Sequence, residues 1–403
     1  MKKRSKGYGL GTLVNHFTEG DNPLNAHVTP IYQTATFSFP DMATGMAIEQ
    51  GRQEGYIYTR VANPNSRQLA KKIAALEGLD FLQSASVEPD NELYQETPPE
   101  QVVDGVVFSS GMAAISAALM ARLKAGDTVI AQQALYGATF NFLNAFAVQR
   151  GVKVTWVEDT SLEGWEQAFA ESPRPVWVYA ETPVNPTMAL IDIRLVAELA
   201  HLHRSWLIVD NTFATPFCQR PLSLGADVVV HSTTKYLSGH GTIIGGAVVS
   251  PHVEYIREQL TKTMHLLGSS PSPFDAWLAN LGLKTFELRM RRHCDNALAL
   301  ARFLEDHPAV ARVYYPGLES HPQRTIAQNQ MSAFGGMLSF ELKGGYNACV
   351  RAMDRFQTVT LGVSLGNTDS LIQHPASMTH SDVPPLERKK MGISDGLVRL
   401  SVG

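Results

Sequence analysis

The feature that most constrains the fold is a regular alternation of apolar runs and amphipathic segments through the middle of the chain. Helix-like segments such as 162–170 and 195–203 separate the runs. Spacings of roughly 20 to 30 residues between runs are typical of βαβ units on a mostly parallel sheet. We therefore predict an α/β fold in which ligands bind at the carboxyl ends of the strands. The strand-like runs begin near Asp104, Asp127, Lys153, Val176, Trp206, Asp227 and Gly245.

Length, charge and cysteine content narrow the class of protein. The 403 residues are enough for two domains, or for one large domain with an appendage. The net charge of −4 comes without a basic stripe, so we expect no nucleic-acid partner. No apolar stretch reaches membrane-spanning length. Three widely separated cysteines indicate neither a disulfide framework nor a zinc site, and we expect a cytoplasmic protein that binds no metal: Cys218, Cys294 and Cys349.

A lysine flanked by hydroxyl side chains follows the predicted strand at 228–230. Ser232 and Thr234 precede Lys235, and a glycine-rich loop comes next. Burial at a strand end favours the neutral amine, which can condense with a carbonyl group, while the hydroxyls can hold a phosphate. This combination is typical of a pyridoxal phosphate site. From this stretch alone, a solvated lysine after a strand is the alternative.

Two further charged residues stand in apolar surroundings. Asp210 ends the run 206–209, where a carboxylate needs a partner, and a protonated pyridine nitrogen would be one. Capping of the next turn is the alternative. Arg399 lies within the apolar segment 397–402, where it could bind a substrate carboxylate or form a structural salt bridge.

Polar residues also gather at other predicted strand ends. Ser110 and Gly111 stand where a strand turns into an alanine-rich helix, and helix starts attract anions, although the same residues occur in plain caps. Tyr136 follows the run 128–132, and Asn185 follows the run 176–181. His231, His201 and His203 are interpreted as structural, since no carboxylate or cysteine completes a metal-ligand set around them.

Proline and glycine divide the chain into parts. The first 65 residues predict an extended arm that lies on a neighbouring molecule, and Tyr58 and Arg60 near its end suit a phosphate. A helix is predicted over 67–77, and a long helical stretch with a kink near Gly282 follows Pro271. The predicted parts are the arm, 1–65; a large domain, 66–275, with an acidic, solvent-exposed insertion at about 80–104; and a small α+β C-terminal domain, 276–403, with strands at 310–315, 336–342 and 397–402.

The order and spacing of these motifs resemble one enzyme family over nearly the whole chain, from Thr29 to Gly403. The chain is similar to the pyridoxal-phosphate enzymes of cysteine and methionine metabolism, the transsulfuration group, and within it to methionine γ-lyases and O-acylhomoserine sulfhydrylases. The motifs that carry the resemblance are Tyr58-Thr-Arg60, Ser110-Gly-Met112, Leu135-Tyr-Gly137, Glu181-Thr-Pro-Val-Asn-Pro186, Val209-Asp-Asn-Thr212, Ser232-Thr-Thr-Lys-Tyr236, Ser364-Leu-Gly366, His374-Pro-Ala-Ser-Met-Thr-His380 and Arg399-Leu-Ser-Val-Gly403.

The resemblance implies roles for individual residues. Lys235 would bond covalently to pyridoxal 5′-phosphate and later move protons. Asp210 would hold the ring nitrogen and Asn185 the ring's phenolic oxygen, while Tyr136 would stack on the ring and act as an acid toward the leaving group. The remaining implied contacts are Ser110, Gly111, Met112, Ser232 and Thr234 with the phosphate, Tyr58 and Arg60 with the phosphate of a neighbouring subunit, and Ser364, Arg399 and Val363 with the substrate.

The resemblance also implies the fold and the assembly. The fold would be that of fold type I enzymes such as aspartate aminotransferase, with a mostly parallel large domain. The assembly would be a homotetramer, a dimer of dimers with shared active sites. Relatives continue past the position of Gly403 with a final helix, so the small domain is expected to be shortened here.

Several positions bear on the reaction. Methionine γ-lyases commonly carry cysteine where Ala138 stands and a Lys-Asp pair at Met264 and His265. Enzymes that cleave cystathionine tend to have glutamate at the position of Val363, and an apolar residue there disfavours a second charged end on the substrate. We expect γ-elimination from methionine or homocysteine. The alternatives are γ-replacement on O-acetyl- or O-succinylhomoserine, cystathionine γ-lyase activity, or a non-catalytic binding protein, which the intact catalytic set opposes.

Overall fold

A seven-stranded sheet organises the larger part of the computed structural model, which describes residues 8–20, 22–84, 98–172, 174–381 and 383–403. The strand order is β1-β7-β6-β5-β4-β2-β3 within these described ranges. Each strand is five residues long and starts at or within one residue of a predicted run. The strands are β1 Asp104–Phe108, β2 Thr128–Gln132, β3 Lys153–Val157, β4 Trp177–Glu181, β5 Trp206–Asp210, β6 Val228–Ser232 and β7 Gly246–Ser250.

The sheet is mostly parallel, which confirms the predicted fold class. Strands β6, β5, β4, β2 and β3 pair in parallel, whereas β7 pairs antiparallel with both β6 and β1. The reversal at β7 has a physical reason: residues 233–245 form turns and loop rather than a crossover helix, and a parallel partner needs a crossover.

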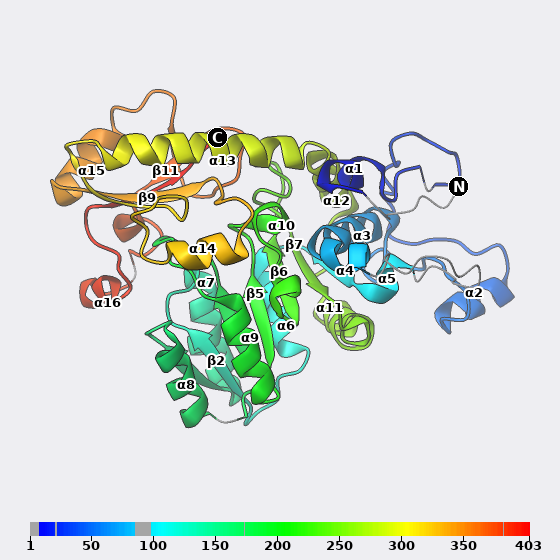
Figure 1. Cartoon of the computed structure of the whole chain (residues 1–403). Helices are drawn as coiled ribbons and strands as arrows, with labels where there is room; N and C mark the ends of the chain where they lie inside the picture. Colours follow the sequence, from blue (N-terminus) through cyan, green and yellow to red (C-terminus); the bar gives the residue numbers. More distant parts are fainter. Residues whose placement is uncertain (1–7, 21, 85–97, 173, 382) are drawn as a thin grey trace.

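Helices cover both faces of the sheet because alternate strand residues are apolar on both sides. On one face, Val228, Val230 and Ile208 pack with α6 and with the π-helical turn Tyr255–Leu260 that precedes α11. On the other face α3 packs over β6 and β7, while α8 and α9 pack over β4 and β5. Figure 1 shows this layered arrangement. The helices are α3 Pro64–Glu77, α6 Gly111–Met120, α7 Gly137–Asn141, α8 Leu162–Glu171, α9 Ile193–Leu202, α10 Thr215–Cys218 and α11 Thr261–Leu267.

A second sheet, with the order β10-β11-β12-β9-β8, forms the core of the C-terminal part of the described chain. Helix α13 packs against β8 and β9, and Figure 1 shows it running along this sheet towards α1. The two short strands β10 and β11 were not predicted, since neither exceeds three residues. The elements are β8 Val310–Tyr314, β9 Met337–Leu342, β10 Thr360–Leu361, β11 Leu371–Gln373, β12 Leu397–Ser401, α14 Arg324–Gln330, α15 Gly345–Met353 and α16 Pro385–Lys390.

The helical stretch predicted after Pro271 is present, and at the predicted kink near Gly282 it is divided into two helices. They are α12, Pro273–Leu283, and α13, Phe286–Glu305. The carbonyl of Gly282 accepts from the Arg289 guanidinium at 2.9 Å instead of continuing the helix. A β-carbon on Gly282 would also lie 2.1 Å from the Ser238 carbonyl oxygen. Glycine thus permits the close contact at which the helix ends.

Two helix starts differ from the prediction because caps lie further upstream. Helix α3 begins at Pro64 rather than position 67, since the Asn63 side chain accepts from the Asn65 amide and proline suits the first turn. Helix α9 begins at Ile193 rather than position 195, capped by Asp192.

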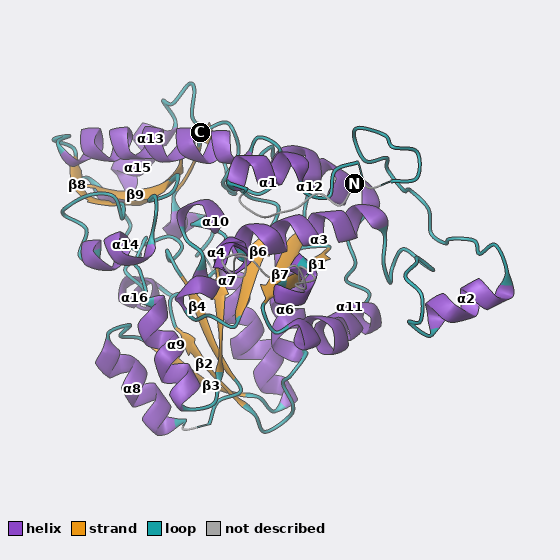
Figure 2. Ribbon diagram, turned by 45° about the vertical axis from the view of Figure 1, so that its right-hand side comes forward, coloured by secondary structure: helices purple, strands orange, loops and turns teal. Residues whose placement is uncertain are grey.

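The N-terminal arm carries the short helices α1, Leu10–His16, and α2, Met42–Glu49. Figures 1 and 2 both show α2 standing away from the main body, and Met42 on it is 87% exposed. Residues 85–97 of the acidic insertion lie outside the described residues. Helices α4 Leu79–Ser84 and α5 Pro99–Val102 flank them. Within the described ranges, no helix combines the length and apolarity needed to cross a membrane.

Candidate active site

Lys235 lies in the turn that follows β6, as predicted. Its Nζ donates to the Ser364 hydroxyl at 2.8 Å, which joins the large sheet to the C-terminal part of the chain. Burial, together with the nearby positive charge of Arg399, lowers the pKa of Lys235 to about 8. Near neutral pH a larger fraction of this amine is therefore neutral and nucleophilic than of an ordinary lysine.

Asp210 ends β5, the strand that pairs with β6, so its carboxylate lies at the same sheet edge as Lys235. Asp210 Oδ1 accepts from the Thr212 amide at 3.0 Å. Burial raises the pKa of Asp210 above its ordinary value, although the bonds from Thr212 oppose the shift. The Thr212 hydroxyl in turn accepts from the Ser232 amide at 2.9 Å, which ties the two strand ends together. A buried carboxylate in this position favours a cationic partner.

Glu181 is the last residue of β4. It belongs to the motif Glu181–Pro186, but the sequence alone assigns it no role. One carboxylate oxygen accepts from the Tyr136 amide at 2.8 Å, and the other accepts from the Asn185 amide at 2.9 Å. Burial and the negative charge of Asp210 raise the pKa of Glu181 to about 8. Its position one strand along from Asp210, also at a strand end, was the signal that could have identified it.

Arg399 projects from β12 and is 4% exposed. Its Nη1 donates to the Asn185 side-chain oxygen at 3.0 Å, and its Nη2 donates to the Ser364 carbonyl at 2.7 Å. Burial lowers its pKa to about 10. No carboxylate of the described ranges forms an ion pair with it, and its Nε has no partner there. A buried guanidinium held only by neutral oxygens can still take up an anion.

The start of α6 approaches the end of β6. Ser110 caps the helix, accepting from the Ala113 amide at 3.0 Å. A β-carbon on Gly111 would lie 2.9 Å from the Ser232 β-carbon, so the two segments are in close contact. Thr234 exchanges bonds with the backbone of Gly245, accepting from its amide at 3.0 Å. The first amides of a ten-residue helix, next to a serine hydroxyl, suit an anion.

The remaining predicted residues are more exposed. Tyr136 is 45% exposed and Val363 is 55% exposed. Tyr58 is 43% exposed, and the Arg60 Nη1 donates to the His265 carbonyl at 2.7 Å beside the end of α11. No hydrogen bond in the described part of the chain joins Tyr58 or Arg60 to Lys235 of the same subunit.

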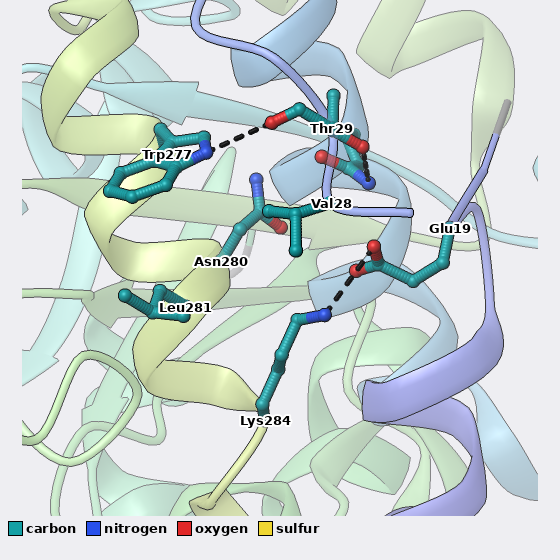
Figure 3. A pocket seen from close by; sticks show the side chains of 8 residues that line it. Glu19, Val28, Thr29, Trp277, Asn280, Leu281 and Lys284 are labelled. Carbon is teal, nitrogen blue, oxygen red and sulfur yellow. Dashed lines mark hydrogen bonds and ion pairs between the residues drawn. The ribbon is translucent and has the colours of Figure 1, made fainter. Parts of the chain in front are cut away.

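Other polar clusters include none of the residues predicted to contact the cofactor or the substrate. A shallow pocket between the N-terminal arm and α12 contains none of the predicted site residues (Figure 3); Glu19, Thr29, Trp277 and Lys284 are among those that line it. His201 and His252 both contact the Asp227 carboxylate at 2.9 Å. His231 is hydrogen-bonded to Glu77 in the core. Within the described residues, no group of three side chains is arranged to hold a metal ion.

Comparison with known proteins decides the family. The model for Cys/Met metabolism PLP-dependent enzymes matches residues 11–86 and 98–403. The chain belongs to this family. The predicted resemblance is thereby confirmed, and the residues between the two matched ranges fall within the acidic insertion.

Among the curated relatives are methionine lyases and cystathionine lyases. The chain is 46% identical over 397 residues to L-methionine gamma-lyase of Porphyromonas gingivalis, covering 98% of this chain and 93% of that one. It is 44% identical to L-methionine gamma-lyase of Pseudomonas putida, covering 100% and 95%. It is 40% identical to cystathionine beta-lyase of Coxiella burnetii, covering 98% and 94%.

A solved structure supports the fold. The structure of cystathionine gamma synthase from Xanthomonas oryzae pv. oryzae, in complex with aminoacrylate and cysteine, matches with a TM-score of 0.87. It is 38% identical to this chain, and the match covers 98% of this chain and 94% of that one. The family and the fold type are therefore established together.

Proposed function

We propose that the protein is a pyridoxal-phosphate-dependent carbon–sulfur lyase. It would carry out γ-elimination on methionine or homocysteine and, with one water, release a thiol or sulfide, 2-oxobutyrate and ammonia. The observation that carries the proposal is that Lys235 and Arg399 both hydrogen-bond to Ser364. These contacts lie at the sheet edge where Asp210 ends the neighbouring strand.

The residues at this edge fit pyridoxal 5′-phosphate. The lowered pKa of the Lys235 amine suits a covalent bond to the aldehyde. Asp210 would hold the ring nitrogen and Asn185 the phenolic oxygen, while Tyr136, which is 45% exposed, would stack on the ring. The phosphate would lie at the start of α6, held by Ser110, Gly111, Met112, Ser232 and Thr234.

When bound, the cofactor supplies an electron sink for the carbanions that form at the substrate's α- and β-carbons. The chain's own residues handle orientation and protons. Arg399 and Ser364 would fix the substrate carboxylate, since the guanidinium Nε is buried and unpartnered in the described structure. Lys235, released by the incoming amino group, would take the proton from Cα and later return protons. The Tyr136 phenol would protonate the departing sulfur.

The choice of substrate rests on the chain's relatives and on Val363. Two relatives at 44% and 46% identity are named methionine gamma-lyases. Val363 presents an exposed apolar surface, which suits the methyl thioether of methionine better than a second carboxylate. The runner-up is γ-replacement on an O-acylhomoserine, since the same proton-handling residues would serve both reactions.

We further propose a homotetramer with shared active sites. Arg60 bonds to His265 rather than to Lys235 of its own chain, and apolar side chains of the arm are exposed, which suits an interface. Leu24 is 83% exposed and Met42 is 87% exposed. Tyr58 and Arg60 would then reach the phosphate of a neighbouring subunit.

A substrate panel tests the proposal. The protein is loaded with pyridoxal 5′-phosphate and incubated with methionine, homocysteine, cystathionine and O-acetylhomoserine, each with and without sulfide. We expect 2-oxobutyrate from methionine or homocysteine, and none from the Lys235→Ala variant. If homocysteine forms from O-acetylhomoserine and sulfide and no substrate gives 2-oxobutyrate, the lyase proposal is wrong and the protein is a transferase.

A further inference from the structure

We propose that Glu181 is a positioning residue that sets the places of the two side chains expected to contact the cofactor ring, Tyr136 and Asn185. The inference deepens the proposed function and rests on it. Glu181 itself would touch neither substrate nor cofactor; it would act through the backbone of the two residues that do.

The first observation is how the Glu181 carboxylate is bonded. Its two oxygens are divided between two segments of chain: one accepts the Tyr136 amide at 2.8 Å and the other accepts the Asn185 amide at 2.9 Å. Tyr136 lies between β2 and α7, directly before the helix, and Asn185 lies in the loop after β4. The Glu181 carboxyl group therefore bridges two loops. The strand ends from which these loops begin, Gln132 and Glu181, are 49 residues apart in sequence.

The second observation is that Glu181 is itself held in place. The Gln132 side chain accepts from the Glu181 amide at 3.1 Å and donates to the Glu181 carbonyl at 3.0 Å. Gln132 is fully buried, and Glu181 is 5% exposed. The Glu181 side chain thus extends from a backbone whose amide and carbonyl are both hydrogen-bonded to Gln132 at the end of β2. Rigid support of this kind is what a residue needs to place others accurately.

The third observation links Glu181 to Asp210. The two residues are register partners at the ends of β4 and β5, so their side chains leave the same face of the sheet. Asn185 is also held from its other end, because its side-chain oxygen accepts from Arg399 at 3.0 Å. Glu181 therefore lies beside Asp210 and, through its bond to Asn185, is connected to Arg399. Arg399 in turn bonds to Ser364.

The ionised form of Glu181 suits this task because each of its two oxygens can accept one backbone hydrogen bond. In Glu181→Gln one oxygen becomes an NH₂ group that would face an N–H donor, so one of the two bonds must be lost. Glu181→Asp keeps the carboxyl group, but it is one methylene shorter and cannot reach both amides from the same backbone position. Asp192→Asn is the matched control, since Asp192 also accepts a backbone amide, that of Leu195 at 3.2 Å, at the start of α9.

The test measures amide hydrogen exchange in the cofactor-free protein from overlapping peptides. We expect exchange at Tyr136 or Asn185 to be at least 10-fold faster in Glu181→Gln, as one lost bond predicts, and unchanged in Asp192→Asn. Unchanged exchange at both amides in Glu181→Gln would overturn the proposal. This measurement needs no turnover, so it stands even if the proposed lyase activity fails.

A second measurement separates positioning from general stability. In the cofactor-loaded protein, Glu181→Gln should lower kcat by about 10- to 100-fold with less than a 3-fold change in KM, and shift the pH at which the cofactor's visible absorbance changes. A merely structural role would lower the melting temperature and leave both the pH profile and the kcat-to-KM split unchanged, which would contradict the proposal. If Glu181→Gln does not fold, Glu181→Asp is measured for the same exchange and pH shifts, and their absence would likewise refute it.

Discussion

Replacing Arg399 with lysine tests the substrate-binding centre of the proposed site. The Arg399 guanidinium makes two hydrogen bonds at the site, to the Asn185 side chain at 3.0 Å and to the Ser364 carbonyl at 2.7 Å. Lysine keeps the positive charge but has one nitrogen in place of the planar fork, so it cannot make both bonds and also bind a carboxylate through two parallel bonds.

The magnitude follows from the bonds lost. A hydrogen bond that involves a charged group contributes about 1.5 to 3 kcal/mol. With the loss of one to two such bonds to the substrate carboxylate, kcat/KM should fall by about 10- to 10⁴-fold, since 1.36 kcal/mol corresponds to a factor of ten. Most of the loss should appear in KM, because the carboxylate is bound equally in the ground state and the transition state.

The assay is the release of 2-oxobutyrate over a range of methionine concentrations, with the cofactor content of each preparation set by its visible absorbance. Ser320→Ala, on an exposed hydroxyl that contacts Glu305, serves as the control. A KM within 3-fold of the unmodified protein, at equal cofactor content, would refute the role given to Arg399.

Three further predictions follow from the site. Because the pKa of Lys235 is lowered to about 8, the rate at which the cofactor-free protein takes up pyridoxal 5′-phosphate, followed by stopped-flow absorbance, should rise with pH through about 8 and level off above it; a rise centred near 10.5 would contradict this. The pKa of Glu181 is higher in the folded than in the unfolded protein, so its contribution to the free energy of unfolding is present below about pH 4.5 and is lost as the pH rises to about 8. In urea unfolding of the cofactor-free protein, the free energy of unfolding should therefore fall over this pH range, and it should fall less in Glu181→Gln. Gly111→Ala would place a β-carbon 2.9 Å from that of Ser232, so the free energy of unfolding should fall by about 1 to 3 kcal/mol and the affinity for the cofactor should weaken, whereas unchanged affinity in equilibrium dialysis would remove α6 from the phosphate site.

Much of the fold could be predicted from local patterns. The runs that became β1 to β7 are short, apolar and bounded by polar residues, so their positions could be assigned to within a residue. The direction of β7 could not, because it depends on whether residues 233–245 form a helix, and that loop carries Lys235 rather than a regular element. The position of the break between α12 and α13 could be predicted from Gly282, but a complete interruption could not, because it depends on the contact of Gly282 with Ser238, which lies far away in sequence.

The site divides along the same line. Lys235, Asp210 and Arg399 stand out in sequence because each places a charge beside an apolar run. Glu181 does the same at the end of β4, yet its role depends on two backbone amides from separate loops, and no sequence pattern specifies those bonds. The limits of the predicted domains, and the role assigned to each site residue, stay predictions.

The most direct test of the central claim is to locate the covalent bond to the cofactor. The protein is loaded with pyridoxal 5′-phosphate, reduced with borohydride to make the linkage permanent, digested and analysed by mass spectrometry. We predict one modified site, at Lys235. Modification at another lysine with Lys235 unmodified, or no modification in protein that binds the cofactor, would contradict the account.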